Sequence, residues 1–170
     1  MDKLLSSYLL LFFLLGSASS ALCDPEITEK EVLNLIDFTA KAIEKDALHT
    51  FKQINNGTHP FKDKARPTLY VFVYDTNVTG IAHFHNPLVG LNFKGKGDVF
   101  GKKFHDEIVT GGLTKGSGHV VYTFAMPGKK GRRYKKTFYK LVTGSNKKQY
   151  VVCCGIYLGV RMNDAGKNVE

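Results

Sequence analysis

Tyrosine, histidine and lysine side chains recur in the β-like segments of this sequence at spacings that could line one cavity. Tyr70 and Tyr74 lie in a β-branched and aromatic run, where alternation along a strand would place both hydroxyls on one face. His83, Tyr122 and Lys140 belong to three later runs of the same kind. A cavity lined by these five groups would suit a small carboxylate, because lysine neutralises its charge while tyrosine and histidine donate hydrogen bonds. Ordinary core or surface roles are the alternative for each residue.

Lys140 is predicted to be the lysine of the cavity because of its position on a predicted strand. Lys136, Phe138 and Lys140 alternate and therefore share one face of the run. We predict that Lys140 points into the cavity. The alternative is a lysine solvated at a sheet edge.

The six histidines raise the question of a metal site. His83 and His85 would share a strand face and could begin a zinc site with His105 or His119. Nothing in the spacing requires a metal, so we predict neither a metal nor another cofactor. The sequence also lacks a glycine-rich phosphate loop followed by lysine, a nucleophile elbow and an HExxH motif. We therefore do not expect an enzyme.

A second possible function comes from a concentration of positive charge in a protein whose formal net charge is +9. The segment 129–136 reads KKGRRYKK and follows Pro127-Gly128, a pattern typical of a hairpin tip. A solvated loop is the simplest interpretation. The functional alternative is a patch that binds an anionic surface or polymer through Lys129, Lys130, Arg132 and Arg133. Tyr134 is the only aromatic residue in the segment, so a base-stacking nucleic-acid site is not expected.

The N-terminal half of the chain predicts a long helix. Thr28 and Glu31 have the spacing of a capping box, and apolar residues then recur every three or four positions as far as Ile54. Asn55-Asn56-Gly57 predicts the end of the helix. A helix of this length either crosses a whole sheet or breaks once, and Lys45-Asp46 is the least apolar place for a break.

The remaining elements predict an α+β fold in which the helix packs on an antiparallel sheet of about five strands. The segment 69–92 predicts a hairpin that turns at Asp75-Thr76-Asn77. A short helix is expected over 102–110, ending at Gly111-Gly112. Three more strands are predicted over 119–125, 134–142 and 149–158. The long helix would cover one sheet face, and the segment 87–112 would cover the other and leave a cavity.

The first residues are typical of a secretory signal. Lys3 precedes an apolar run over 4–15, which is too short to span a membrane as a helix, and small residues follow as far as Ala21. We predict a signal peptide over 1–21, one domain over 22–160 and a frayed tail over 161–170. The protein would be exported, to a periplasm or the outside. Lipidation at Cys23 or an uncleaved anchor are less favoured alternatives.

Only three cysteines remain for an oxidising compartment, which makes no obvious disulfide framework. One bridge from Cys23 to Cys153 or Cys154 is possible. For the adjacent pair we favour a buried strand in which each cysteine behaves as a small hydrophobic residue, since neighbours along a strand point to opposite faces.

Six blocks in one order carry a resemblance to a known family: LYVFVYD, GIAHFHNPLVGLNF, GKKFHDEIV, KGSGHVVYTFAMPG, KKTFYKLV and YVVCCGIY. Over residues 26–158 the chain resembles the single Cache domains of bacterial extracytoplasmic sensors. The AHxxxP pattern of that family matches Ala82, His83 and Pro87, its GxN step matches Gly90 and Asn92, and the lysine that ends its fifth block matches Lys140.

The resemblance implies a PAS-like sheet with a long N-terminal helix and a pocket for small metabolites, often organic acids. His119 stands where the family often has tryptophan, and Phe138 stands where it usually has tyrosine, which would remove one hydroxyl from the ligand site. We therefore expect an exported binding protein for sensing or signalling, with a possible membrane-bound partner. The alternative is an interaction protein that uses the basic hairpin 129–136.

Overall fold

The long helix predicted from the sequence is two helices, separated by a single residue. The computed structural model describes residues 26–162 and 168–169, so the predicted signal peptide and Cys23 lie outside it. Helix α1 covers Glu29–Lys45 and begins with the predicted capping box, and α2 covers Ala47–Asn55. Asp46 lies between them in an extended conformation and accepts a hydrogen bond from the His49 amide with its side chain. The predicted break at Lys45-Asp46 is confirmed.

The five predicted strands form one antiparallel sheet in the order β2-β1-β5-β4-β3. Their bounds are β1 Val71–Asp75, β2 Gly80–His83, β3 Ser117–Ala125, β4 Arg132–Thr143 and β5 Gln149–Met162. A short β6, Asn168–Val169, pairs with the end of β5. The predicted tail over 161–170 is thus described only in part, and the described part is paired with the sheet.

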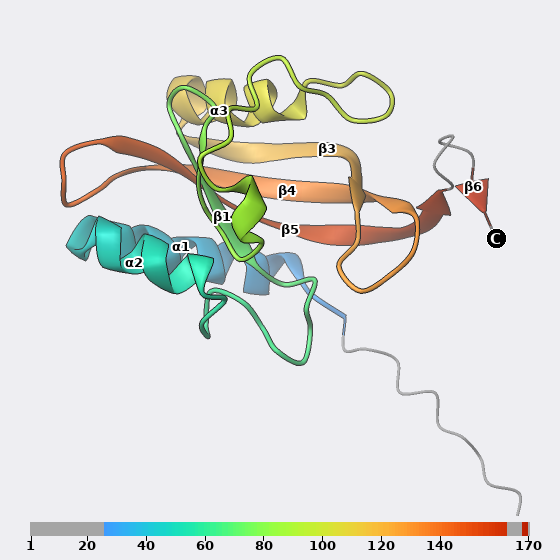
Figure 1. The fold of residues 1–170 in the computed structure, drawn as a ribbon, viewed down its shortest axis with the longest axis horizontal. Helices are drawn as coiled ribbons and strands as arrows, with labels where there is room; N and C mark the ends of the chain where they lie inside the picture. Colours follow the sequence, from blue (N-terminus) through green and yellow to red (C-terminus); the bar gives the residue numbers. More distant parts are fainter. Residues whose placement is uncertain (1–25, 163–167, 170) are drawn as a thin grey trace, which may run out of the picture.

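Both faces of the sheet are covered, which confirms the predicted α+β arrangement. Figure 1 shows α1 and α2 on one side and α3, Phe104–Lys115, with the loop before it on the other. The helix-side core includes Ile36, Ile43 and Ile54 and packs on alternate strand residues such as Val71 and Val73. Phe72 and Tyr74 on the other face of β1, and Tyr70 just before the strand, belong to the second core cluster. The sheet therefore separates an aliphatic layer from an aromatic one.

The segment between β2 and α3 lies over the aromatic layer, as predicted. It begins with the short 3-10 helix η1, Asn86–Leu88, and is tied to the hairpin by backbone hydrogen bonds between Gly90 and Gly80 and between Phe93 and Val78. Further along, the Asp98 carboxylate accepts hydrogen bonds from the amides of Phe100, Lys102 and Thr123. The covering segment is thereby attached to the edge strand β3.

Helix α3 continues past the point where the sequence predicted its end. Gly111 and Gly112 lie inside the helix, which ends only at Lys115. A Cβ atom on Gly111 would meet the Tyr139 ring, and one on Gly112 would lie 2.9 Å from a Val151 methyl group. The two glycines therefore allow the helix to approach the sheet closely, and the prediction that they stop the helix is wrong.

Cys153 and Cys154 are both buried on β5, and neither forms a disulfide within the described residues, which do not include Cys23. Cys153 belongs to the aromatic layer and Cys154 to the aliphatic one, as expected of strand neighbours. Within the described part of the chain, no helix is long and apolar enough to cross a membrane.

Candidate functional site

A cavity of about 120 Å³ lies between the aromatic face of the sheet and the segment that covers it. This volume has room for several water molecules or for a ligand of a few non-hydrogen atoms. Every strand of the main sheet path except β5 supplies lining residues, as do η1, α3 and the chain between them. The lining consists of Tyr70, Phe72, Val73, Tyr74, Gly80, Ala82, His83, Leu88, Phe93, Phe104, His105, Tyr122, Phe124 and Lys135.

Lys135 is the one charged side chain in this lining, and it is only 1% exposed. Its Nζ donates a hydrogen bond of 2.8 Å to the Tyr70 hydroxyl and lies 4.1 Å from the centre of the Tyr70 ring. Its Nζ is also 5.0 Å from the ring centres of Phe72 and Tyr157. Burial lowers the pKa of Lys135 to about 8, so the ammonium form still prevails at neutral pH. The ammonium group contacts aromatic faces and one hydroxyl, and in the part of the chain that the structure describes it forms no ion pair with a carboxylate.

The two histidines of the cavity are uncharged at neutral pH. Burial lowers the pKa of His83 to about 3, with a further contribution from the positive charge of Lys135, and lowers that of His105 to about 4. His83 Nδ1 accepts a hydrogen bond of 2.9 Å from the His85 amide, so the neutral ring carries its proton on Nε2. His105 Nδ1 is 2.6 Å from the Tyr74 hydroxyl. Both rings are therefore fixed by neighbours on the chain.

A chain of hydroxyl groups leads from Lys135 toward the edge of the sheet. The Tyr70 and Tyr157 hydroxyls are 3.1 Å apart, and Tyr157 donates to the Ala125 carbonyl at 2.8 Å. Tyr157 thus uses its proton on the backbone, which leaves its oxygen to accept from Tyr70. Nearby, the Tyr122 hydroxyl is 2.9 Å from Thr137 Oγ1. Burial raises the pKa of each of these phenols, so they remain protonated donors and acceptors.

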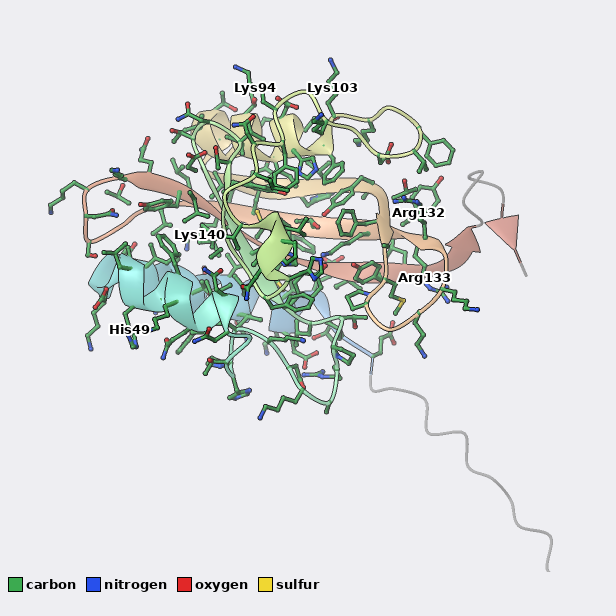
Figure 2. All side chains as sticks on the ribbon, in the orientation of Figure 1. His49, Lys94, Lys103, Arg132, Arg133 and Lys140 are labelled. Carbon is green, nitrogen blue, oxygen red and sulfur yellow. The ribbon has the colours of Figure 1, made fainter. Side chains whose placement is uncertain are left out.

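The structure brings together four of the five residues predicted to bind a ligand, because Tyr70, Tyr74, His83 and Tyr122 all line the cavity. Lys140 does not. Its Nζ lies 2.7 Å from the Asp37 carboxylate on α1. Figure 2 shows Lys140 on the side of the sheet that the helices α1 and α2 cover. Lys136, Phe138 and Lys140 do share one face of β4, as predicted, but that face packs on α1. The prediction that Lys140 points into the cavity is therefore wrong.

The lysine that reaches the cavity belongs to the other alternating set of β4. Lys135, Thr137 and Tyr139 face the aromatic layer, whereas Phe138 lies in the aliphatic core beneath the helices. Phe138 therefore removes no hydroxyl from the cavity, contrary to the expectation. A signal for Lys135 was present in the sequence, since Lys135 and Lys136 are adjacent and one of the two must point to each face.

The basic segment 129–136 is not one solvated patch in this structure. Lys135 is buried in the cavity, and Lys136 makes an ion pair of 2.6 Å with Glu29. Of the four residues proposed for polyanion binding, Lys129 and Lys130 are exposed, and Arg132 and Arg133 are half-buried. Arg133 donates a hydrogen bond to the Gly159 carbonyl. Polyanion binding stays a prediction.

Among residues 26–162 and 168–169 there is no group of three or more histidine, cysteine or acidic side chains that could hold a metal ion. His85 is exposed next to His83 and does not line the cavity, whereas His105 is buried and does. His119 packs against Phe138, with ring centres 5.7 Å apart, and so lies on the other face of the sheet.

Solved structures of low sequence identity share this fold. The chain aligns with a periplasmic sensor domain of a chemotaxis protein at 21% identity and a TM-score of 0.57, covering 75% of this chain and 88% of that one. It aligns with a Cache chemosensory domain that recognises carboxylic acids at 18% identity and a TM-score of 0.61, covering 76% and 92%. A methyl-accepting chemotaxis protein from Vibrio parahaemolyticus aligns at 16% identity and a TM-score of 0.59, covering 75% and 86%.

No curated protein sequence matches the chain. A family description does match: that of Single Cache domain 2, over residues 26–169. This match covers nearly all of the described structure, including both helices that cover the aliphatic face and all strands of the sheet. The chain therefore belongs to the Single Cache domain 2 family.

Proposed function

We propose that this protein is an exported, non-catalytic sensor component that binds a small organic acid in the cavity beneath the segment 86–104. The observation that carries the proposal is Lys135, a buried ammonium group that faces the cavity and has no carboxylate partner among residues 26–162 and 168–169. Buried charges are normally paired, so an anionic ligand is the natural partner of this group. Lys135 takes the role that the sequence assigned to Lys140.

In the proposed complex, the ligand carboxylate accepts a hydrogen bond from Lys135 Nζ, which has three donor positions and uses one of them on Tyr70. His83 supplies a neutral donor at Nε2, and the Tyr70, Tyr74 and Tyr122 side chains form part of the wall. A charge-assisted hydrogen bond in a water-poor cavity is stronger than the same bond at the surface. The aromatic walls would contact the rest of the ligand.

A thermal-shift and calorimetric screen of small organic acids tests this proposal. A ligand at about 100 times its Kd adds about 2.7 kcal/mol to the free energy of unfolding, so the melting temperature should rise with acid concentration. Lys135→Met should abolish the shift, because a methionine keeps the bulk of the side chain and removes the charge. Lys140→Met is the matched control on the same strand and should retain it.

The proposal is abandoned if no acid at millimolar concentration stabilises a well-folded wild-type protein. It is also abandoned if Lys135→Met binds an acid as tightly as the wild type. Retained binding in Lys140→Met would support the choice of Lys135 over Lys140.

We further propose that residues 1–21 direct export and that ligand occupancy is passed to a membrane-bound signalling partner. Support comes from the apolar run over 4–15 and from the similarity to sensor domains of chemotaxis proteins. Intact-mass measurement of the protein recovered from a periplasmic fraction tests the export. A mature N-terminus near Leu22 is expected, and retention of the full-length chain in the cytoplasm would contradict it.

A further inference from the structure

We infer that one edge of β5 is a docking site for an extended acidic segment of a partner protein, which pairs with residues 156–159 as an added strand. A strand edge whose backbone groups are unpaired is a natural template for a segment of another chain. The pairing of β5, the groove beside its edge and the charges around that groove carry this inference. It is independent of any ligand in the aromatic cavity, because it concerns a different surface.

Strand β5 is longer than the strands that pair with it on the β1 side. β1 begins at Val71, opposite Cys154, and β6 pairs only with Arg161 and Met162. These two residues also pair with β4, so β6 lies on the other edge of β5, the edge that β1 uses. Within the described residues, no strand pairs with 156–160 on that edge. The main chain there has donors and acceptors available to a further strand.

A groove of about 310 Å³ lies along this free edge. Its lining includes residues 156–159 of β5, Met126 and Lys129 from the turn between β3 and β4, and Ile27 and Pro67 from the chain before α1 and before β1. Figure 1 shows the turn between β3 and β4 reaching past β5 toward the start of α1. The free edge is therefore accessible between two walls.

An added strand would present its side chains alternately to these two walls. The turn between β3 and β4 lies on the aromatic side of the sheet, where the Tyr157 hydroxyl donates to the Ala125 carbonyl at 2.8 Å. The other wall lies on the helix side, where Arg66 is paired with Glu31 of α1. Leu158 is 39% exposed in the groove, and an apolar side chain of the added strand would cover it.

The positive charge around the groove favours acidic side chains on the added strand. Lys129 lines the groove, and Lys130 and Arg132 follow it in the same hairpin. In the part of the chain that the structure describes, none of these three side chains forms an ion pair, whereas Arg66 is already paired. Glu26 is the only acidic residue among the described residues that line the groove. Glutamate or aspartate side chains would thus be attracted, and lysine side chains would be repelled.

The free edge has room for a short strand. Residues 156–159 span about 13 Å at the usual rise per residue. The Gly159 carbonyl already accepts a hydrogen bond of 2.9 Å from Arg133 Nη1, so an added strand would pair chiefly with the residues before it. A polyanion without amide groups could use only the charges. Backbone pairing therefore distinguishes a docked peptide from a polyanion that is attracted by charge alone.

Fluorescence anisotropy of labelled peptides with the full mature chain tests this inference. The probe is an acetylated and amidated peptide of about eight residues that alternates glutamate and valine. One matched peptide has lysine in place of glutamate, and two others carry a methyl group on the backbone nitrogen of every glutamate or of every valine. We expect the probe to bind, and the lysine peptide and at least one methylated peptide to bind at least about tenfold more weakly. Failure of the probe to bind, or equal binding of both methylated peptides, overturns the inference.

Charge reversal in the hairpin tests the place of binding. Lys129 and Lys130 are exposed, so Lys129→Glu with Lys130→Glu should keep the fold and weaken the probe at least about tenfold. Lys147→Glu with Lys148→Glu changes two exposed lysines in the turn between β4 and β5 and should leave the affinity unchanged. An equal loss in both double variants would mean attraction by net charge alone and would overturn the inference.

Amide hydrogen exchange shows which strand edge the probe occupies. Amides within 156–159 should exchange more slowly in the complex, and those of β2, at the outer edge of the sheet, should not change. Slow exchange of 156–159 in the peptide-free mature chain at every concentration would place residues 22–25 of the same chain at this edge. Slow exchange that increases with protein concentration would place a second copy there. Either result overturns the assignment to a partner protein.

Discussion

The buried ammonium group of Lys135 lowers the free energy of unfolding, and in the proposed complex it binds the ligand carboxylate. Taking an ammonium group out of water is unfavourable, and the lowered pKa of Lys135, about 8 against an ordinary 10.5, expresses that cost. The faces of Tyr70 and Phe72 and the Tyr70 hydroxyl recover part of it. A charged group that is buried although water would solvate it better is typical of a binding site rather than of a hydrophobic core.

We predict that Lys135→Met stabilises the ligand-free protein at neutral pH by up to about 3 kcal/mol, the equivalent of the depressed pKa. The sign follows from proton binding. Between pH 8 and 10.5 the unfolded lysine keeps its proton while the folded one loses it, so wild-type stability gains from this group as the pH rises. The advantage of the variant is therefore largest below pH 8 and shrinks toward pH 10.5.

Urea denaturation of the wild type and of Lys135→Met at several pH values measures the difference in their free energies of unfolding. The other titratable groups are the same in both proteins, so their contributions to the pH dependence cancel in this difference. Lys140→Met is again the control, since its ammonium group is half-exposed and paired with Asp37. A large loss of stability in Lys135→Met at neutral pH would show that the lysine is a structural element and not a strained ligand-binding group.

At the scale of elements, α3 is held against the sheet by close packing of glycine on an aromatic ring. Gly111 faces the Tyr139 hydroxyl, and Gly118 on β3 faces the same ring from another side. Tyr139 is buried between them. The position of α3 sets the position of Phe104 and His105, two of the residues that line the cavity.

We predict that Gly111→Ala destabilises the protein by about 1 to 3 kcal/mol, because the added methyl group meets the Tyr139 ring in a filled layer. Alanine is intrinsically the better helix former by up to about 1 kcal/mol, so the loss would come from packing alone. Thermal unfolding measures it. Thr110→Ala, at the exposed neighbouring position, is the control, and Gly111→Ala with Tyr139→Phe should recover part of the stability. A neutral Gly111→Ala variant would contradict this account of the helix position.

The loop before α3 depends on Asp98. Its Oδ1 accepts from the Phe100 and Lys102 amides, and its Oδ2 accepts from the Thr123 amide and hydroxyl. Burial acts to raise the pKa of Asp98, but these hydrogen bonds outweigh it and lower the pKa. The carboxylate thus joins the loop to an edge strand whose amide would otherwise face solvent.

We predict that Asp98→Ala costs about 1 to 3 kcal/mol of stability through the amides left unpaired. Because the folded pKa is lowered, this stabilisation is present above the ordinary pKa of 3.8 and is lost as the pH falls through the lowered value. Hydrogen exchange of the Thr123 amide reports the bond directly. Asp106→Ala is a comparison in the same layer that removes one hydrogen bond, to the Gly95 amide. Equal protection of Thr123 in Asp98→Ala and wild type would contradict the assignment.

At the scale of the whole molecule, the positive charge is spread rather than concentrated. The net charge is +9, yet in the basic segment one lysine is buried and another is paired with α1. A second group of lysines lies in the loop before α3, where Figure 2 labels Lys94 and Lys103 at the opposite side of the molecule from α2. A distributed charge attracts anions weakly and without a fixed site.

We predict that neutralising Lys129, Lys130, Arg132 and Arg133 lowers affinity for heparin, a model polyanion, no more than neutralising Lys94, Lys96, Lys102 and Lys103. Both variants remove four positive charges. Affinity measured across a salt series separates them, because a dedicated patch would reduce the salt slope in one variant only. A markedly greater loss in the hairpin variant would favour the alternative function.

Much of the fold could be predicted because its signals are local. The capping box at Thr28, the break at Asp46 and the turn at Asp75 depend on side chains that bond to nearby amides, and all three occur as expected. The end of α3 could not be predicted in this way. A glycine pair that ends a helix and one that lets a helix approach a sheet look alike in sequence, and Tyr139 and Val151 decide between them.

The sequence alone determined that β4 carries a lysine on each face, since Lys135 and Lys136 are adjacent on a strand. It also placed Tyr70, Tyr74, His83 and Tyr122 around one cavity, which the structure shows. Only the tertiary structure decided which lysine joins them. In a sheet covered on both faces, hydrophobic alternation does not distinguish one face from the other. Glu29 and Asp37 on α1 pair with Lys136 and Lys140, so Lys135 is the lysine that turns toward the aromatic layer.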